Sequence, residues 1–191
     1  MTPSVACLDI GSVAIGYVCL ELASRLEIEI VEASVVGGAR FQIFLRGSEA
    51  AVAEAVHAAQ KSALAGGVDA TSFESEVLTP EPPGLFAAMY SLAEQRLDES
   101  LIVCEAPSMS ALFAAAGVLL ATGQLRAIEI KALRGATAGA LGFFTGPASA
   151  CGLAAEGARA RWKASGRSGR IECLDAPSEK FREYFNLDGR A

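Results

Sequence analysis

The sequence predicts an α+β protein with two tandem domains, each of which has the element order β-α-β-β-α-β. Segments of similar composition recur at offsets of 96 to 99 residues along the 191-residue chain, which indicates an internal duplication. Each half alternates short apolar segments, typical of strands, with alanine-rich segments, typical of helices. This element order belongs to the ferredoxin-like folds. We expect a first domain at residues 1–90, a charged linker at 91–99 and a second domain at 100–191.

Each half opens with an apolar strand that ends in an acidic residue and a nearby serine. Residues 4–12, SVACLDIGS, match residues 100–108, SLIVCEAPS, at an offset of 96. A weakly charged or uncharged helical segment follows each strand, and a β-rich segment with partial alternation follows the helix. The expected helices are residues 13–26 and 109–123, and the expected second strands are residues 28–36 and 125–133.

A glycine-rich turn comes next in each half and leads into a third strand, an alanine-rich helix and a last strand. The third strands match at an offset of 99, so the second turn is about three residues longer than the first. Ser48 as N-cap and Pro147 in the first turn are good helix starts. The expected segments are strands 41–45 and 140–145, helices 50–63 and 148–164, strands 72–78 and 170–174, and short amphipathic tails 80–90 and 177–185.

Composition and charge exclude several classes of protein. The chain is 52% hydrophobic and 20% charged, which is too apolar for a disordered protein. Its net charge of −6 argues against a nucleic-acid or anionic-membrane partner. Residues 106–125 and 135–155 are uncharged and long enough to span a bilayer, but polar residues and glycines interrupt them. We therefore expect no membrane span, and we expect no signal peptide because a basic n-region is missing.

The residues that could carry chemistry are few, so we expect neither an enzyme nor a metal or cofactor site. His57 is the only histidine, and the five cysteines are scattered without a CxxC motif, which is typical of buried free thiols. Trp162 is expected to pack at a helix end. The recurring acids are expected to form ion pairs at strand edges or interfaces; they are Asp9, Glu29, Glu105 and Glu129.

Together, several segments resemble the tandem-domain shell proteins of bacterial microcompartments, the trimer-forming type found in propanediol-utilising compartments. The first strand and the SVAIG segment at residues 12–16 carry the resemblance, as does the strand at 28–36 that runs into GGAR. FQIFLRGSEAAV at residues 41–52 and the closing LTP at 78–80 carry it further. The second half keeps the layout through FFTGPA, and the resemblance covers roughly residues 4–90 and 100–185.

The resemblance implies a homotrimer whose six domains form a pseudohexameric tile in the shell of a cytoplasmic microcompartment. Such tiles pack edge to edge with other shell proteins and enclose enzymes, and their central pore passes metabolites. The loops between the second and third strands line that pore. Carried over to this sequence, the pore-lining residues are Gly37, Gly38, Ala39, Arg40, Arg134, Gly135, Ala136, Thr137, Ala138 and Gly139. Arg40 and Arg134 would add positive charge there.

The sequence departs from the family at two points. Some tandem relatives hold an iron–sulfur cluster through a cysteine in the first pore loop, but Gly37 stands at that position and neither loop has a cysteine, so we expect no cluster. The lysine at the tile edge is replaced by Ser24 and Ala121, with Arg25 adjacent. An alternative function stays open, a regulatory protein with a duplicated ferredoxin-like fold that binds a small anion through backbone N–H groups of the glycine loops.

Overall fold

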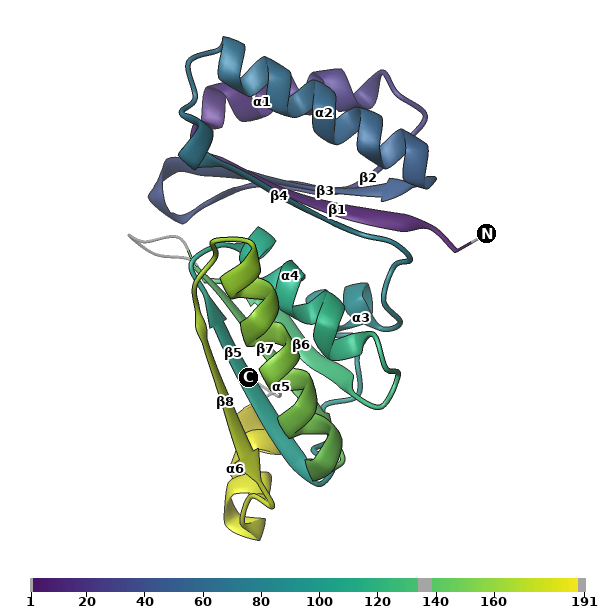
Figure 1. Cartoon of the computed structure of the whole chain (residues 1–191), viewed down its shortest axis with the longest axis vertical. Coiled ribbons are helices and arrows are strands. Elements are labelled where there is room, and N and C mark those ends of the chain that lie inside the picture. Colours follow the sequence, from purple (N-terminus) through teal and green to yellow (C-terminus); the bar gives the residue numbers. More distant parts are fainter. Residues whose placement is uncertain (1, 134–138, 189–191) are drawn as a thin grey trace. The chain divides into compact units, whose positions relative to one another are not determined.

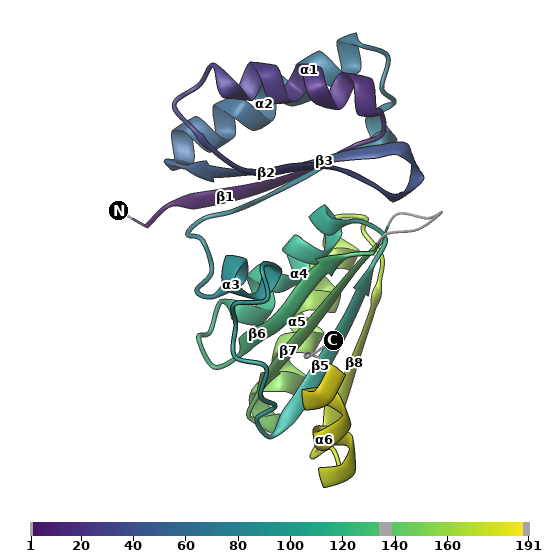
Figure 2. The same cartoon turned by 180° about the vertical axis from the view of Figure 1, so that it is seen from behind.

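The computed structural model describes residues 2–133 and 139–188, and Figures 1 and 2 show its elements from opposite sides. The chain forms two compact units. Unit 1 consists of Met1–Glu81 together with Ser108–Phe113 and Ala132–Gly139, and unit 2 consists of Pro82–Pro107, Ala114–Lys131 and Ala140–Ala191. The segment 82–99 therefore lies with the second unit.

The first part of the chain forms a four-stranded antiparallel sheet with the strand order β2-β3-β1-β4. Helices α1 and α2 cover one face of this sheet (Figure 1). The elements are β1 (Ser4–Ile10), α1 (Val13–Ser24), β2 (Glu29–Val36), β3 (Arg40–Gly47), α2 (Glu49–Ala65) and β4 (Phe73–Leu78). Ser12 and Ser48 are the N-caps of α1 and α2, and their hydroxyl oxygens accept hydrogen bonds from backbone N–H groups three residues later.

The rest of the chain repeats this order in a second four-stranded sheet, β6-β7-β5-β8. Its elements are α3 (Leu85–Met89), β5 (Ser100–Ala106), α4 (Met109–Leu120), β6 (Arg126–Ala132), β7 (Ala140–Gly146), α5 (Ala148–Ala164), β8 (Arg170–Asp175) and α6 (Glu179–Asp188). Pro147 is the N-cap of α5, so it lies one position before the first turn in which we expected it.

The strand registers confirm the duplication. Asp9 pairs with Gln42 on β3 and with Glu74 on β4. Glu105, which is 96 residues later, pairs with Leu141 and Arg170. Leu141 lies 99 residues after Gln42, and Arg170 lies 96 residues after Glu74. The predicted α+β fold of two tandem ferredoxin-like domains is therefore confirmed.

Alternation along β1 divides unit 1 into a helix-facing core and an opposite face. Ala6, Leu8 and Ile10 belong to a cluster with the apolar residues of α1 and α2. The intervening residues Cys7 and Asp9 point to the other face, because successive strand residues alternate between faces. They are nevertheless buried, at 0% and 2% exposure. Both faces of this sheet therefore carry buried side chains near β1.

In the second unit, apolar side chains also cluster on the sheet face opposite α5. Strand residues pack there against residues from the segment before β5 and from α6; the cluster consists of Leu97, Leu101, Val103, Ile128, Phe143, Leu174 and Phe181. Arg182 on α6 holds this arrangement by donating hydrogen bonds to the carbonyl oxygens of residues 97–99. Gln95 donates to the Ile128 carbonyl at 3.1 Å, which places the segment before β5 along β6. Within the described residues, none of the helices is both long and apolar enough to cross a membrane.

Candidate functional site

The first predicted pore loop is a tight hairpin turn between β2 and β3. Val36 pairs with Arg40, so only Gly37, Gly38 and Ala39 lie between the strands. Gly38 and Ala39 have φ angles of 72° and 57°. This left-handed conformation costs a non-glycine residue about 1–2 kcal/mol, and glycine adopts it freely. Because Gly38 and Ala39 are also exposed, the turn presents backbone and one methyl group to its surroundings.

Arg40, the last predicted residue of this loop, is folded back on the sheet. One of its terminal nitrogens, Nη2, lies 3.7 Å from a carboxylate oxygen of Glu74 and 3.5 Å from the carbonyl oxygen of Asp9. The side chain is only 19% exposed. Its Nε is buried, and no acceptor in the described part of the chain bonds to it. Glu74 therefore offsets part of the positive charge that we expected Arg40 to contribute at the loop.

Asp9 lies beside Arg40 and is almost fully buried. Gln42 donates from Nε2 to its Oδ1 at 2.9 Å, and the backbone N–H of Ser110 donates to its Oδ2 at 2.7 Å. Both donors are neutral, and β1 lies inside the sheet between β3 and β4. Among the described residues, neutral donors rather than an ion pair therefore bind the Asp9 carboxylate, and the strand that carries it is not an edge strand. A carboxylate can stay buried when it accepts several hydrogen bonds.

Ser108 and Ser110 complete what we call the Asp9 cluster, which consists of Asp9, Arg40, Gln42, Glu74, Ser108 and Ser110. The Ser108 hydroxyl donates to Glu74 Oε2 at 2.6 Å and accepts from the N–H of Ala111 at 3.1 Å. All six residues belong to unit 1. We did not predict the cluster, but an acidic residue at the end of the apolar strand SVACLDI was the available signal.

The second predicted pore loop falls mostly outside the described residues. Arg134, Gly135, Ala136, Thr137 and Ala138 are not described, and Gly139 is. The Leu133 N–H donates to the Gly139 carbonyl at 2.8 Å. The strand bounds leave residues 133–139 between β6 and β7, whereas only residues 37–39 lie between β2 and β3. The second connection is therefore longer, as predicted.

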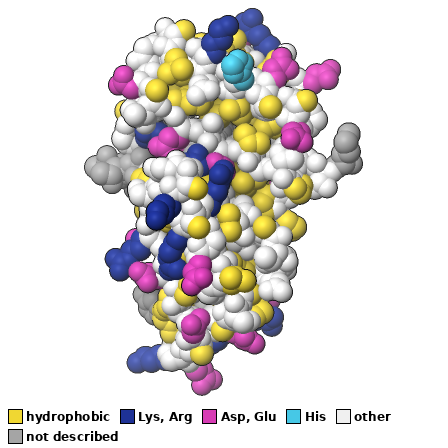
Figure 3. Space-filling model, in the orientation of Figure 1, with side chains coloured by type: hydrophobic (Ala, Val, Ile, Leu, Met, Phe, Trp, Pro, Cys, Tyr) yellow, Lys and Arg dark blue, Asp and Glu magenta, His cyan; other side chains and the backbone are white. Residues whose placement is uncertain are grey.

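The other recurring acids have ordinary surroundings. Glu29 lies 3.8 Å from Arg46, and Glu129 lies 3.0 Å from Lys131, which confirms the expected ion pairs at these two positions. Glu105 is exposed on β5. Acidic and basic side chains occur together on the face shown in Figure 3, which also shows the single histidine, His57, exposed on α2.

The described residues offer little for catalysis. No group of three or more His, Cys, Asp or Glu side chains in residues 2–133 and 139–188 is placed to hold a metal ion. All five cysteines are free, and Cys7, the nearest to Asp9, is fully buried. Burial raises the pKa of the Cys7 thiol well above its ordinary value, and the Asp9 charge raises it further. This thiol is therefore a poor nucleophile.

An open cleft of about 420 Å³ lies at the other end of β1. It is lined by Thr2, Pro3, Ser4, Gly47, Ser48, Glu49, Thr79 and Pro80. Ser4 pairs with Gly47, whereas Ile10 pairs with Phe41 at the hairpin end of the same ladder. The cleft is thus remote from the turn at residues 37–39, which is one of the two glycine loops at which the anion-binding alternative places its ligand.

Comparisons with known proteins find similarity to solved structures but not to sequence families. No family model matches the chain, and no curated protein is similar to it in sequence. A putative glycine cleavage system transcriptional repressor and a heme-binding protein from Thermus thermophilus cover 91% and 97% of the chain. Their TM-scores are only 0.34 and 0.30, and their sequence identities 12% and 13%, so they support no argument.

The crystal structure of a microcompartments protein from Desulfitobacterium hafniense DCB is much more similar. It superposes with a TM-score of 0.79 over 96% of this chain and 99% of that chain, at 19% sequence identity. Because the match covers 96% of this chain, it spans both halves of the duplication. The chain therefore has the tandem two-domain α+β fold of a microcompartment protein.

Proposed function

We propose that the chain is a structural protein of a bacterial microcompartment shell and that it has no enzymatic activity. The observation that carries this proposal is the full-length similarity to the Desulfitobacterium protein, which spans both halves of the duplication. The site supports the proposal. The hairpin consists of small residues, and the polar groups of the Asp9 cluster bond to one another in a buried network, so neither feature presents a reactive group. The shell would lie in the cytoplasm.

In this proposal three chains form a pseudohexameric tile, and the β2–β3 and β6–β7 connections line its central pore. Gly37, Gly38 and Ala39 suit such a position, because short side chains let several copies of a turn approach one axis. Arg40 anchors the turn through Glu74 and Asp9. Other shell proteins would be the partners at the tile edges, and the enclosed enzymes would lie behind the shell.

The mass in solution tests the assembly. We expect light scattering after size exclusion to give about 59 kDa, three times the chain mass of 19.7 kDa, or twice that value for paired trimers. Electron microscopy of the same sample should then show ordered flat sheets. A stable monomer or dimer would contradict the tile.

Substitution in the turn tests the pore. Replacing Gly37 with Trp should narrow the opening and slow the entry of substrate into intact compartments, while the tile still assembles. Replacing Leu153, which is 73% exposed on α5, with Trp is the matched control because it adds the same ring to an element that belongs to neither predicted pore loop. Equal substrate flux in both variants would argue against a pore at this turn.

A further inference from the structure

We infer that the C-terminal end of α5 and the loop that leads into β8 form a binding surface for an acidic segment of another protein. The cations of this surface, which we call the basic strip, are Arg159, Arg161, Lys163, Arg167 and Arg170. All of them belong to unit 2. Binding at the basic strip does not require the proposed trimer, so the inference goes beyond the proposed function.

Positive charge is concentrated in the basic strip although the chain as a whole is acidic. Residues 157–171 contain five of the 16 Lys and Arg residues and no Asp or Glu, whereas the net charge of the chain is −6. Arg167 is partly exposed, and the other cations of the strip are exposed. Figure 3 shows Lys and Arg side chains gathered on the face that includes α5 and β8. A local surplus of positive charge attracts acidic partners.

The fold does not require this charge, because the first half of the chain builds the same elements without it. Residues 58–75 correspond to residues 157–171 and comprise the end of α2, a loop and the start of β4. They contain one basic and two acidic residues. The last turn of α2 has no basic residue, whereas that of α5 has Arg161 and Lys163. We therefore attribute the cations to binding rather than to folding.

Packing around Trp162 holds the basic strip in place. Trp162 is 3% exposed, and its ring lies so close to Gly169 that a Cβ added there would be 2.4 Å from it. The Arg167 N–H donates to the Trp162 carbonyl at 2.9 Å, which fixes the loop against the end of α5. Arg159 donates from Nη2 to the Ile171 carbonyl, which ties α5 to β8. A surface that is already ordered loses less conformational entropy when a partner binds.

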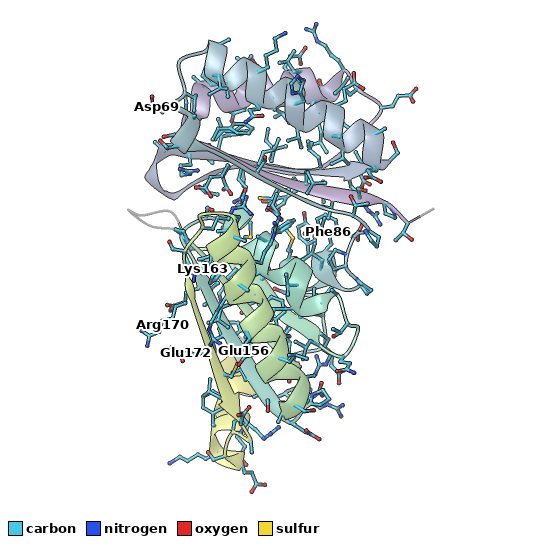
Figure 4. All side chains as sticks on the ribbon, viewed as in Figure 1. Asp69, Phe86, Glu156, Lys163, Arg170 and Glu172 are labelled. Carbon is cyan, nitrogen blue, oxygen red and sulfur yellow. The ribbon has the colours of Figure 1, made fainter. Side chains whose placement is uncertain are left out.

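Glu172 offsets part of the charge of the strip. It lies 2.8 Å from Arg170, and the two side chains are 57% and 71% exposed. Arg170 lowers the pKa of Glu172 through a hydrogen bond and through its charge, and Arg159 adds a smaller effect. Figure 4 shows Arg170 and Glu172 together on β8, and Lys163 on α5. Exposed ion pairs are weak, so a carboxylate of a partner can compete with Glu172.

The spacing of two cations on α5 fits an extended partner. Arg159 and Lys163 are four residues apart, so their side chains lie one above the other on one face of the helix. A rise of about 1.5 Å per residue separates them by about 6 Å along the helix axis. In an extended chain, alternate residues point to the same side and lie about 6.8 Å apart. A segment with acidic residues at alternate positions can therefore pair with both cations.

A protein segment fits the basic strip better than a nucleic acid does. Surfaces that bind single-stranded nucleic acids combine cations with aromatic rings on which the bases stack. Trp162 is the one aromatic residue among residues 157–171, and it is buried. The net charge of −6 also repels a long polyanion. Carboxylates of a short segment need no stacking, and they pair well with guanidinium groups.

Fluorescence anisotropy with an acidic peptide tests the surface. The probe is a fluorescein-labelled peptide in which glutamates alternate with serines, and its glutamine analogue is the blank. We expect saturable binding of the glutamate peptide that weakens as salt is added, because salt screens exposed charges. The variant Arg159→Gln with Lys163→Gln should bind the peptide about tenfold more weakly than the wild type.

The control is the variant Lys61→Gln with Lys180→Gln, which removes the same charge at exposed positions on α2 and α6. It should bind the peptide as tightly as the wild type does, and circular dichroism should show native helix content in both variants. Equal binding by the two variants, or no binding by the wild type, would overturn the inference.

Cross-linking locates the bound peptide. A carbodiimide joins a carboxylate to a neighbouring lysine amine, and an amide forms with loss of water. The chain has four lysines, at positions 61, 131, 163 and 180. Mass spectrometry should find the peptide mainly on Lys163. The same yield on Lys61 or Lys180 would contradict the position of the surface.

A labelled oligothymidylate with as many charges as the peptide tests the kind of partner. We expect it to bind more weakly than the peptide, and equal or tighter binding would overturn the assignment to an acidic protein segment. The tile fails separately. A monomeric wild type that binds the peptide at Lys163 would contradict the tile and support the basic strip, whereas a trimer that does not bind the peptide would do the reverse.

Discussion

The Asp9 carboxylate accepts a 2.7 Å hydrogen bond from the backbone N–H of Ser110, although 101 residues separate them. Asp9→Ala removes the acceptor and leaves this N–H and the amide of Gln42 buried without it. We expect the free energy of unfolding to fall by about 2–4 kcal/mol, since each unsatisfied donor costs about 1–3 kcal/mol. Urea unfolding followed by circular dichroism measures the loss. Glu54→Ala, at an exposed position on α2, should change stability little.

Two glycines in helices should respond oppositely to alanine. A Cβ at Gly16 would lie 2.3 Å from the Phe41 side chain, so Gly16→Ala forces the helix away from the sheet. We expect a loss of about 1–3 kcal/mol from this overpacking. Gly152 has open space around the same position. Gly152→Ala should therefore stabilise α5 by about 0.5–1 kcal/mol. Thermal unfolding would contradict this account if both variants moved the melting temperature in the same direction.

Cys104 should make the protein less stable at alkaline pH. Burial raises the pKa of this thiol from 9.0 to about 12, and the nearby Glu105 charge adds to the shift. Above pH 9 the unfolded chain loses the thiol proton while the folded chain keeps it, so stability falls as pH rises through this window. The slope contributed by one thiol reaches about 1.4 kcal/mol per pH unit. Urea unfolding measured at a series of pH values from about 8 to about 11 tests this. The free energy of unfolding should decline less steeply with pH in Cys104→Ala than in the wild type.

Arg182 should hold α6 in place. Its guanidinium donates to the Glu99 carbonyl at 2.8 Å and to the Pro177 carbonyl at 3.0 Å. Charge-assisted hydrogen bonds contribute about 1.5–3 kcal/mol, so Arg182→Ala should release the helix locally. Hydrogen exchange should then become faster at residues 179–183 and 97–99. Lys180→Ala, on an exposed position of the same helix, is the control. Unchanged hydrogen exchange in Arg182→Ala would show that Phe181 and its apolar neighbours are sufficient to hold α6 in place.

Much of the fold could be predicted because each sequence pattern occurs in both halves of the chain, so that one copy supports the assignment of the other. The strand SVACLDI is ambiguous alone, but its match to SLIVCEA at a constant offset supports both assignments. The offsets of 96 and 99 recur in the observed strand registers. The position of residues 93–96 along β6 could not be predicted, because the hydrogen bond from Gln95 to a backbone carbonyl leaves no pattern in the sequence.

The candidate site was predicted only in part. Glycine content marks the turn at residues 37–39, since few other residues adopt a positive φ, but it does not show that Ala39 adopts one as well. The role of Asp9 depends on Ser110, which lies far along the chain, and only tertiary structure brings such residues together. The pairing of Arg40 with Glu74 was missed for the same reason.

The hydrogen bond between Asp9 and Ser110 forms inside one polypeptide, so dilution does not weaken it. A tethered contact behaves as if its partner were present at about millimolar concentration. A contact of the same kind between separate chains has no such advantage and depends on how much protein the cell makes. Larger assemblies would thus form only once the concentration of the protein is high enough. The internal contact, in contrast, forms in each chain at any concentration.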